Sequence, residues 1–252
     1  MDNLFKRLRQ ELKRDYGITK KSISFVPFED WRKKLITYPN EFEKEYSENM
    51  LFLKKKIGLD NLREIKSPNK KLILFTGIPG AGKTTLARMI EKSIPNTILL
   101  RGHDLVDMLR LYRENIELYR ERLRNKGFEF PDPWYISYLY QEGLTRDCLK
   151  LGYNIVFDDH IRTKENRFGY LRLARQCDAK IALIQINVPF KTYLGREEGK
   201  TNLEKVKFLA NFIFQSEDIS EAERKRYDKV IQIDGTSSLK DIKRVLIPKL
   251  IS

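Results

Sequence analysis

The chain has 252 residues, a net charge of +14 and a hydrophobic content of 41%. This length is enough for a hydrophobic core, in one large domain or in one domain with a smaller companion. No apolar run approaches the roughly 20 residues that span a membrane, and the mixed-charge N-terminus does not resemble a secretory signal. Two cysteines, Cys148 and Cys177, are too few for a disulfide framework. These features exclude a membrane protein and predict a cytoplasmic one; they do not indicate an oligomeric state.

The positive charge is concentrated in two regions of the chain. Residues 1–70 carry a net charge of +6 and residues 161–200 a net charge of +5. Such an excess favours a polyanionic partner, such as nucleic acid or an acidic surface. The alternative is a lysine-rich composition whose charges only solvate the protein.

Residues 1–68 are predicted to form a mostly helical N-terminal extension. Asp2 or Asn3 can cap a first helix that Gly17 ends, and a second helix is predicted over residues 40–57. The apolar residues of the first helix recur on one face: Leu4, Phe5, Leu8 and Leu12. The extension could bind tRNA or another partner, or it could brace the rest of the chain. A second domain is predicted over residues 69–252.

From Lys71 onward, short apolar runs alternate with helical patterns, which predicts βαβ units and a parallel sheet. Such runs are typical of strands buried on both faces. Strands are predicted at residues 72–76, 97–101, 154–158, 181–187 and 229–233. Helices are predicted at 83–93, 104–125, 134–151, 164–176, 190–198, within 202–225 and at 238–248. The predicted fold class is α/β, with a five-stranded, mostly parallel sheet flanked by helices.

A glycine-rich loop joins the first of these strands to the helix after it. The sequence from Gly77 to Thr84 fits the phosphate-binding pattern G-x-x-x-x-G-K-[ST]. Its glycines let backbone N–H groups approach phosphate oxygens, Lys83 supplies a positive charge, and the Thr84 hydroxyl can hold Mg²⁺. The loop predicts a P-loop NTPase that binds ATP and Mg²⁺ through Gly77, Pro79, Gly80, Ala81, Gly82, Lys83, Thr84 and Thr85.

Charged and polar residues follow the other strands at their carboxyl ends, where α/β sheets bind ligands. Two carboxylates there can divide the work, because one can accept a proton from a hydroxyl while the other orients Mg²⁺. Asp104 could instead only cap the helix that follows it. The residues that follow the strands at this edge are Arg101, His103, Asp104, Asp158, Asp159, His160, Gly235 and Thr236.

Four motifs in this order resemble those of a known group of kinases. They are GIPGAGKTT, LRGHD, GYNIVFDDHIRTKENR and INVPFKTYLGREEGK. Together they are similar to the kinase domain of phage-type polynucleotide 5′-hydroxyl kinases and to the related zeta toxins and seryl-tRNA kinases. The resemblance covers residues 70–240 or so, and the ordered set is more specific than the phosphate-binding loop alone.

The resemblance implies roles for particular residues. Asp104 matches the general base of this group, and Asp158 matches the acidic residue that ends the third strand and helps to hold the metal. Arg196 and Lys200 match the basic residues of a lid that closes on the nucleotide. Arg167 matches a basic residue on the helix after the third motif. The adenine is expected near Gly235 and Thr236.

The sequence also departs from the pattern of this group. His103 replaces an acidic or polar residue before the base, and Asp159 and His160 replace a more usual Thr/Gly–Asn/Thr pair. These departures concern the acceptor substrate, as does the segment from Leu105 to Gln141, where this group usually builds its acceptor pocket. Arg101, His103, Asp158, Asp159, His160 and Arg167 are the predicted substrate-binding residues.

The motifs predict transfer of phosphate from ATP to a hydroxyl group, with Lys83, Asp104 and Arg196 as the catalytic residues. The net charge and the resemblance favour a nucleic-acid acceptor, either an RNA 5′-hydroxyl end or a tRNA. One alternative is a small-molecule kinase of the zeta-toxin type, which acts on a nucleotide sugar or another metabolite. Another is an RNA-binding switch that hydrolyses ATP slowly.

Overall fold

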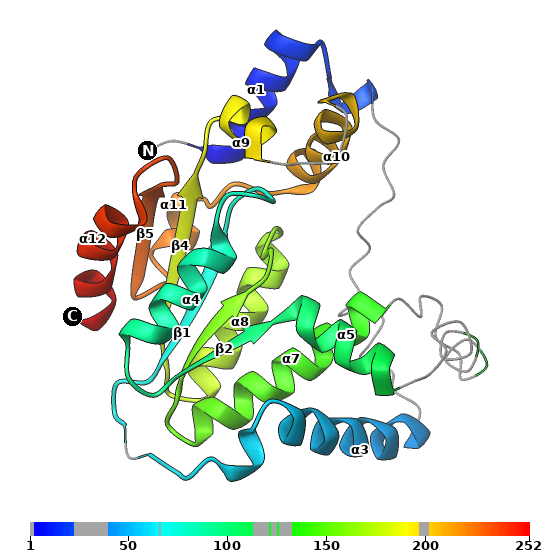
Figure 1. Ribbon diagram of the computed structural model, residues 1–252, viewed down its shortest axis with the longest axis vertical. Coiled ribbons are helices and arrows are strands. Elements are labelled where there is room, and N and C mark those ends of the chain that lie inside the picture. The colour runs from blue at the N-terminus through cyan, green and yellow to red at the C-terminus, as the bar shows by residue number, and fades with distance from the viewer. Residues whose placement is uncertain are drawn as a thin grey trace.

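The computed structural model describes residues 3–22, 40–65, 67–112, 121, 125, 133–196 and 202–252. Its five strands form one sheet in the order β2-β3-β1-β4-β5, and every pairing is parallel (Figure 1). The strands are β1 (Lys71–Thr76), β2 (Thr97–Arg101), β3 (Asn154–Asp158), β4 (Lys180–Asn187) and β5 (Lys229–Asp234). The α/β fold class with a five-stranded sheet is therefore confirmed, and the sheet is parallel throughout.

The helices begin and end close to the predicted positions. They are α1 (Leu4–Tyr16), α3 (Asn40–Lys56), α4 (Lys83–Ser93), α5 (Gly102–Tyr112), α7 (Pro133–Lys150), α8 (Lys164–Gln176), α9 (Phe190–Arg196), α10 (Asn202–Gln215), α11 (Glu221–Arg224) and α12 (Leu239–Ile251), with short 3₁₀ turns at Lys20–Ser22 and Leu59–Asn61. The predicted helix 104–125 begins two residues earlier, at Gly102, and most of its second half lies outside the described residues. Helix α12 continues past Pro248, because Leu250 is buried in the core.

Side chains alternate between the two faces of the sheet, and each face has its own core. Ile73 and Phe75 of β1 join a cluster that includes residues of α1, α4, α10 and α12. Leu72 and Leu74 join the cluster of α3, α5, α7 and α8. This alternation follows from the two-residue period of a strand. Helices on both sides therefore leave the carboxyl edge of the sheet as the place where loops can gather around a ligand.

Helix α1 packs against α10, beside the short helix α9 (Figure 1). Its N-cap residue Asn3 makes no capping hydrogen bond with its side chain. The free backbone N–H groups of Phe5 and Lys6 instead donate to the Asp218 carboxylate at 2.8 and 3.0 Å, and Arg9 pairs with the same group at 2.9 Å. Asp218 thus caps α1 from the other end of the sequence. The domain boundary at residue 68 stays a prediction.

We expect Asp218→Ala to loosen α1, because two helix N–H groups lose their acceptor and the Arg9 guanidinium keeps the carbonyls of Ile213 and Ser216 but loses its ion pair. The loss of a cap costs about 2 kcal/mol, so amide hydrogens in α1 should exchange roughly 30-fold faster. Hydrogen exchange followed by mass spectrometry measures this. Asp15→Ala, which removes an exposed carboxylate on α1, should leave that exchange unchanged. Equal exchange in wild type and Asp218→Ala would show that packing alone holds the helix.

Candidate active site

The glycine-rich loop turns sharply between β1 and α4. Gly80 and Gly82 have φ angles of 72° and 97°, in the left-handed region that favours glycine. The buried Lys83 ammonium donates to the carbonyls of Gly77 and Ile78 at 3.2 and 2.7 Å. Burial lowers the pKa of Lys83 to about 7, and a bound phosphate would favour its charged form. The other predicted residues of the loop lie in the same turn and the first turn of α4: Pro79, Ala81, Thr84 and Thr85.

Thr84 and Asp158 meet where the loop faces the neighbouring strand β3. The Thr84 hydroxyl donates to Asp158 Oδ1 at 3.2 Å, and the Asp158 side chain is buried. These two oxygens are ligands of the kind that Mg²⁺ prefers. In the described ranges, no three His, Cys, Asp or Glu side chains group together to hold a metal.

Arg101 connects this position to the predicted base. Its Nη1 lies 3.0 Å from the Asp104 carboxylate, and its Nε lies 3.4 Å from Asp158 Oδ2. The register of β2 against β3 pairs Arg101 with Asp158, which explains the second contact. Since α5 begins at Gly102, Asp104 lies in the first turn of the helix and is not its N-cap. The side chain is 43% exposed and therefore accessible to a substrate.

Arg196 joins the glycine-rich loop to the turn after β5. Arg196, at the end of α9, donates through Nη2 to the carbonyl of Gly235 at 2.8 Å and through Nη1 to that of Gly80 at 3.4 Å. The ring of Tyr193 also covers Gly80, because a Cβ there would come within 2.6 Å of it. Helix α9 thus rests on the loop through two side chains. Lys200 lies outside the described residues.

The turn after β5 packs against the same loop. A Cβ on Gly235 would meet Val188 Cγ2 at 2.5 Å and the Ala81 carbonyl at 3.3 Å, so the turn has room for glycine only. The backbone N–H and the hydroxyl of Thr236 both donate to Asp234 Oδ1, at 2.9 and 2.7 Å. Gly235 and Thr236 therefore lie on the nucleotide-binding edge of the sheet.

Asp159 and His160 continue from β3 into the same region. Burial raises the pKa of Asp159 and lowers that of His160. The His160 ring packs edge-on against the ring of Phe212 on α10, with 4.9 Å between the ring centroids. The Nδ1 atom of His160 is buried without a hydrogen-bond partner. His103 lies exposed in the first turn of α5. The two histidines therefore occupy different surroundings, although the sequence placed both beside the site.

Arg167 has a different environment from the one that the resemblance implies. It is fully buried in α8, and its guanidinium forms an ion pair with Glu223, with Nη2 at 3.0 Å from Oε2. It also donates to the carbonyls of Arg162 and Glu217 at 3.0 and 3.1 Å and of Asp218 at 3.4 Å. These contacts give it a packing role, and a predicted substrate contact does not agree with them. We leave Arg167 out of the proposed site.

The sequence reasoning missed Tyr193 and Gln141. Tyr193 lies within the fourth motif, three residues before the lid arginine, and no spacing singles it out. Gln141 lies within α7, where Ser137, Gln141 and Thr145 recur every four residues and are all fully buried. A polar series at four-residue spacing, set among the apolar residues of one helix face, is a signal that could have been found.

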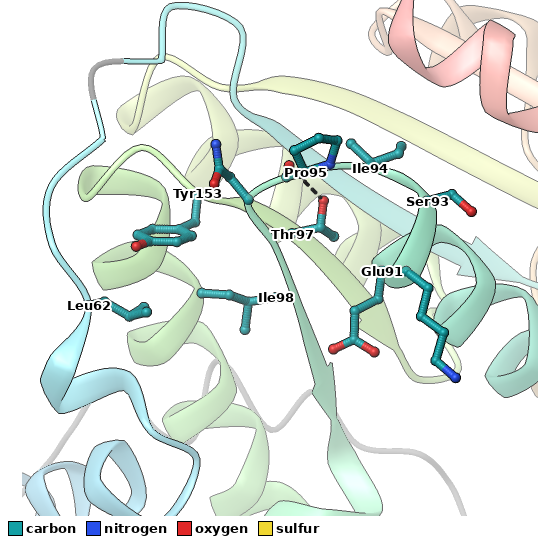
Figure 2. A pocket seen from close by; sticks show the side chains of 10 residues that line it. Leu62, Glu91, Ser93, Ile94, Pro95, Thr97, Ile98 and Tyr153 are labelled. Atoms are coloured by element: carbon teal, nitrogen blue, oxygen red, sulfur yellow. Dashed lines mark hydrogen bonds between the residues drawn. The ribbon is translucent and has the colours of Figure 1, made fainter.

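A surface hollow of about 410 Å³ lies at the opposite edge of the sheet. Its lining includes Pro95 and Thr97 at the start of β2, Tyr153 before β3, and Leu62 (Figure 2). Since the strands are parallel, this edge is remote from the loop that follows β1. The hollow is therefore not part of the candidate active site. None of the helices in the described ranges has the length and apolar character that crossing a membrane requires.

A phosphate-binding loop at the carboxyl edge of a parallel sheet, facing a carboxylate of the neighbouring strand, defines the class: the protein is a P-loop kinase, a phosphotransferase. The chain belongs to the AAA_33 family, described as an AAA domain, whose profile matches residues 72–233, more than half of the sequence. No curated protein matches the sequence significantly.

Several solved structures are similar to this one. The structure of the PezAT chromosomal toxin–antitoxin system of Streptococcus pneumoniae has a TM-score of 0.53 and 17% identity, with 85% of this chain and 93% of that chain covered. A gluconokinase from Sinorhizobium meliloti 1021 has a TM-score of 0.45 and 14% identity, with 74% of this chain and 94% of that chain covered. The Deinococcus radiodurans tunicamycin resistance protein has a TM-score of 0.46 and 14% identity, with 72% of this chain and 96% of that chain covered. At such identities, the likeness to the PezAT structure concerns the fold.

Proposed function

We propose that the protein transfers the γ-phosphoryl group of ATP to a hydroxyl group. The observation that carries this proposal is the chain of contacts from Thr84 to Asp158 and from there through Arg101 to Asp104. It joins the nucleotide-binding loop, across the end of β3, to an accessible carboxylate in the helix that follows β2. Asp104 accepts the proton of the hydroxyl while the new O–P bond forms, the bond to the β-phosphate oxygen breaks, and ADP leaves.

The other residues of the site stabilise charge during this step. Lys83 and the N–H groups of the loop bind the phosphates, and Arg196 offsets charge on the transferred group from the lid, with Lys200 proposed to assist it. Mg²⁺, held by Thr84 and Asp158, would polarise the phosphate oxygens when bound. Gly235 and Thr236 are proposed to border the adenine.

The test is incubation of the protein with γ-labelled ATP and three acceptor pools: total RNA, oligonucleotides with 5′-hydroxyl ends, and small metabolites. We expect label in one of these pools and none without acceptor. ATP hydrolysis without any labelled acceptor would favour a nucleotide-dependent switch and contradict the proposal.

A nucleic-acid acceptor, RNA or tRNA, is the candidate that the net charge of +14 favours, because this charge suits a polyanion. A small-molecule acceptor is the second candidate, because Asp104, Asp158 and Asp159 bring three carboxylates to the acceptor side of the loop. The two differ in salt dependence: raising the salt concentration from 50 to 200 mM should weaken nucleic-acid binding by orders of magnitude and barely affect an uncharged acceptor.

The magnesium site gives a separate prediction. We expect Asp158→Asn to raise the Mg²⁺ concentration at half-maximal turnover about 10- to 100-fold, because the amide is a neutral and weaker ligand. A Mg²⁺ titration of turnover at saturating ATP measures it. Asp147→Asn, in an ion pair with Lys54 on the outer side of α7, is the matched control and should leave the titration unchanged. An unaltered Mg²⁺ dependence in Asp158→Asn would remove Asp158 from the metal site.

A further inference from the structure

Buried polar atoms without partners, on α7 and directly after β3, gather around Gly102, two residues before Asp104. Gln141 has 0% of its side chain exposed, and neither Oε1 nor Nε2 has a hydrogen-bond partner. Oδ2 of Asp159 is also buried without a partner, whereas Oδ1 accepts from the His160 N–H at 2.5 Å. Unpaired buried donors and acceptors cost free energy and are rare, so we expect a bound water or a ligand to satisfy these atoms.

The two side chains converge on Gly102. A Cβ at this position would lie 2.6 Å from Asp159 Oδ2 and 2.7 Å from Gln141 Nε2. Gly102 is the first residue of α5, and Asp104, the proposed base, follows two residues later. The φ angle of Gly102 is not in the left-handed region, so the backbone does not require glycine there. What requires glycine is the space that the two polar groups occupy.

We propose that Gln141 and Asp159 bind the acceptor, and that the acceptor is a small uncharged molecule with adjacent hydroxyl groups. This inference rests on the proposed phosphotransferase function. A hydroxyl can both donate and accept, so one such group can donate to Asp159 and a second can donate to Oε1 and accept from Nε2 of Gln141. The neighbouring hydroxyl is then the one that Asp104 deprotonates and ATP phosphorylates.

The charges around the pair favour an uncharged acceptor. Asp104, Asp158 and Asp159 are acidic. Arg101 is engaged by the first two of them, and Arg162 and His103 act on Asp159. The acidic and basic groups largely offset one another, so the pair offers no surplus of positive charge to an acceptor with a phosphate next to the reacting hydroxyl. A sugar or polyol needs no such surplus and offers hydroxyls at the required spacing.

The experiment measures phosphorylation with γ-labelled ATP of glucose, ribose, myo-inositol and adenosine as uncharged probes. Glucose 6-phosphate and a 5′-hydroxyl RNA oligonucleotide are the charged comparisons. We expect label on at least one uncharged probe and less on the charged ones. Preferential labelling of the oligonucleotide or of glucose 6-phosphate would overturn the inference, as would ATP consumption without label on any uncharged probe. A protein that consumes no ATP with any acceptor would instead overturn the proposed function.

Three variants test the role of Gln141 and Asp159, with the uncharged probe that is phosphorylated most strongly. We expect Gln141→Leu to raise the KM for the acceptor at least tenfold with the KM for ATP unchanged. Gly102→Ala should do the same, because its Cβ displaces both polar groups while alanine favours the helix. Asn49→Leu is the control, because it removes another buried amide. The Asn49 side chain, on α3, donates at 2.7 Å to the hydroxyl of Tyr140, which lies next to Gln141 on α7. It should lower the melting temperature and leave the acceptor KM unchanged.

An unchanged acceptor KM in both Gln141→Leu and Gly102→Ala would mean that the pair holds only a buried water, and the inference would be wrong. Binding of the uncharged probes to the ADP·Mg²⁺ form, followed by saturation-transfer NMR, tests the same pair without turnover. We expect the signal of the wild-type protein to disappear in Gln141→Leu. A signal of equal size in the two proteins would contradict the assignment independently of any catalysis.

Discussion

Asp104→Asn is expected to lower kcat by about 10²- to 10⁴-fold, because an amide cannot accept the proton of the attacking hydroxyl. ATP binding should stay nearly intact, since Asp104 contacts Arg101 and not the phosphate-binding loop. Single-turnover phosphorylation of the acceptor, together with equilibrium binding of a fluorescent ATP analogue, separates the two quantities. A loss of ATP binding of the same size as the loss of turnover would assign Asp104 to nucleotide binding.

The matched control for this variant lies on the same helix. Asp107→Asn makes the same chemical change one turn further along α5, at an exposed position. We expect its turnover to stay within about twofold of the wild-type value, as is usual for a surface change away from a site. If Asp104→Asn and Asp107→Asn behaved alike, the proposed base would be wrong, and a water or another carboxylate would have to accept the proton.

Arg167→Met is expected to have the largest effect on stability. Arg167 and Glu223 have 0% and 1% of their side chains exposed, and removing one partner leaves an uncompensated buried charge. The free energy of unfolding should fall by about 3–5 kcal/mol, which corresponds to a drop of about 10 °C in melting temperature for a chain of this length. Urea denaturation and calorimetry measure these changes.

The controls for Arg167 separate packing from catalysis. The double variant Arg167→Met/Glu223→Leu should recover part of the lost stability, because no buried charge is left. The carbonyls of Glu217 and Asp218 lose Arg167 as their donor, whereas the carbonyl of Arg162 still accepts from the Glu217 N–H. Asp147→Asn, which breaks the half-exposed pair with Lys54, should cost at most about 1 kcal/mol. A variant Arg167→Lys that is fully stable yet has a raised KM for the acceptor would restore the substrate contact that the resemblance implied.

Features that depend on neighbouring residues in the sequence could be predicted before the structure was known. The strand, the glycine-rich loop and the helix around Lys83 are consecutive, so their pattern specifies the local backbone. The approach of Asp158 to Thr84 was also within reach, because parallel strands bring their carboxyl ends to one edge. Helix ends were less predictable: α5 begins at Gly102, although Asp104 resembles a cap.

The sheet, the phosphate-binding loop and the side of the molecule on which chemistry can occur could all be derived from the amino-acid sequence, since they follow from short-range patterns and from the geometry of parallel strands. Which charged residues are partners depends on the tertiary fold. Asp218 caps a helix 213 residues away, and Arg167 meets Glu223 across 56 residues. The approach of Gln141 and Asp159 to Gly102 likewise joins residues that are distant in the sequence. No sequence period links such residues, because their proximity comes from the packing of helices on the sheet.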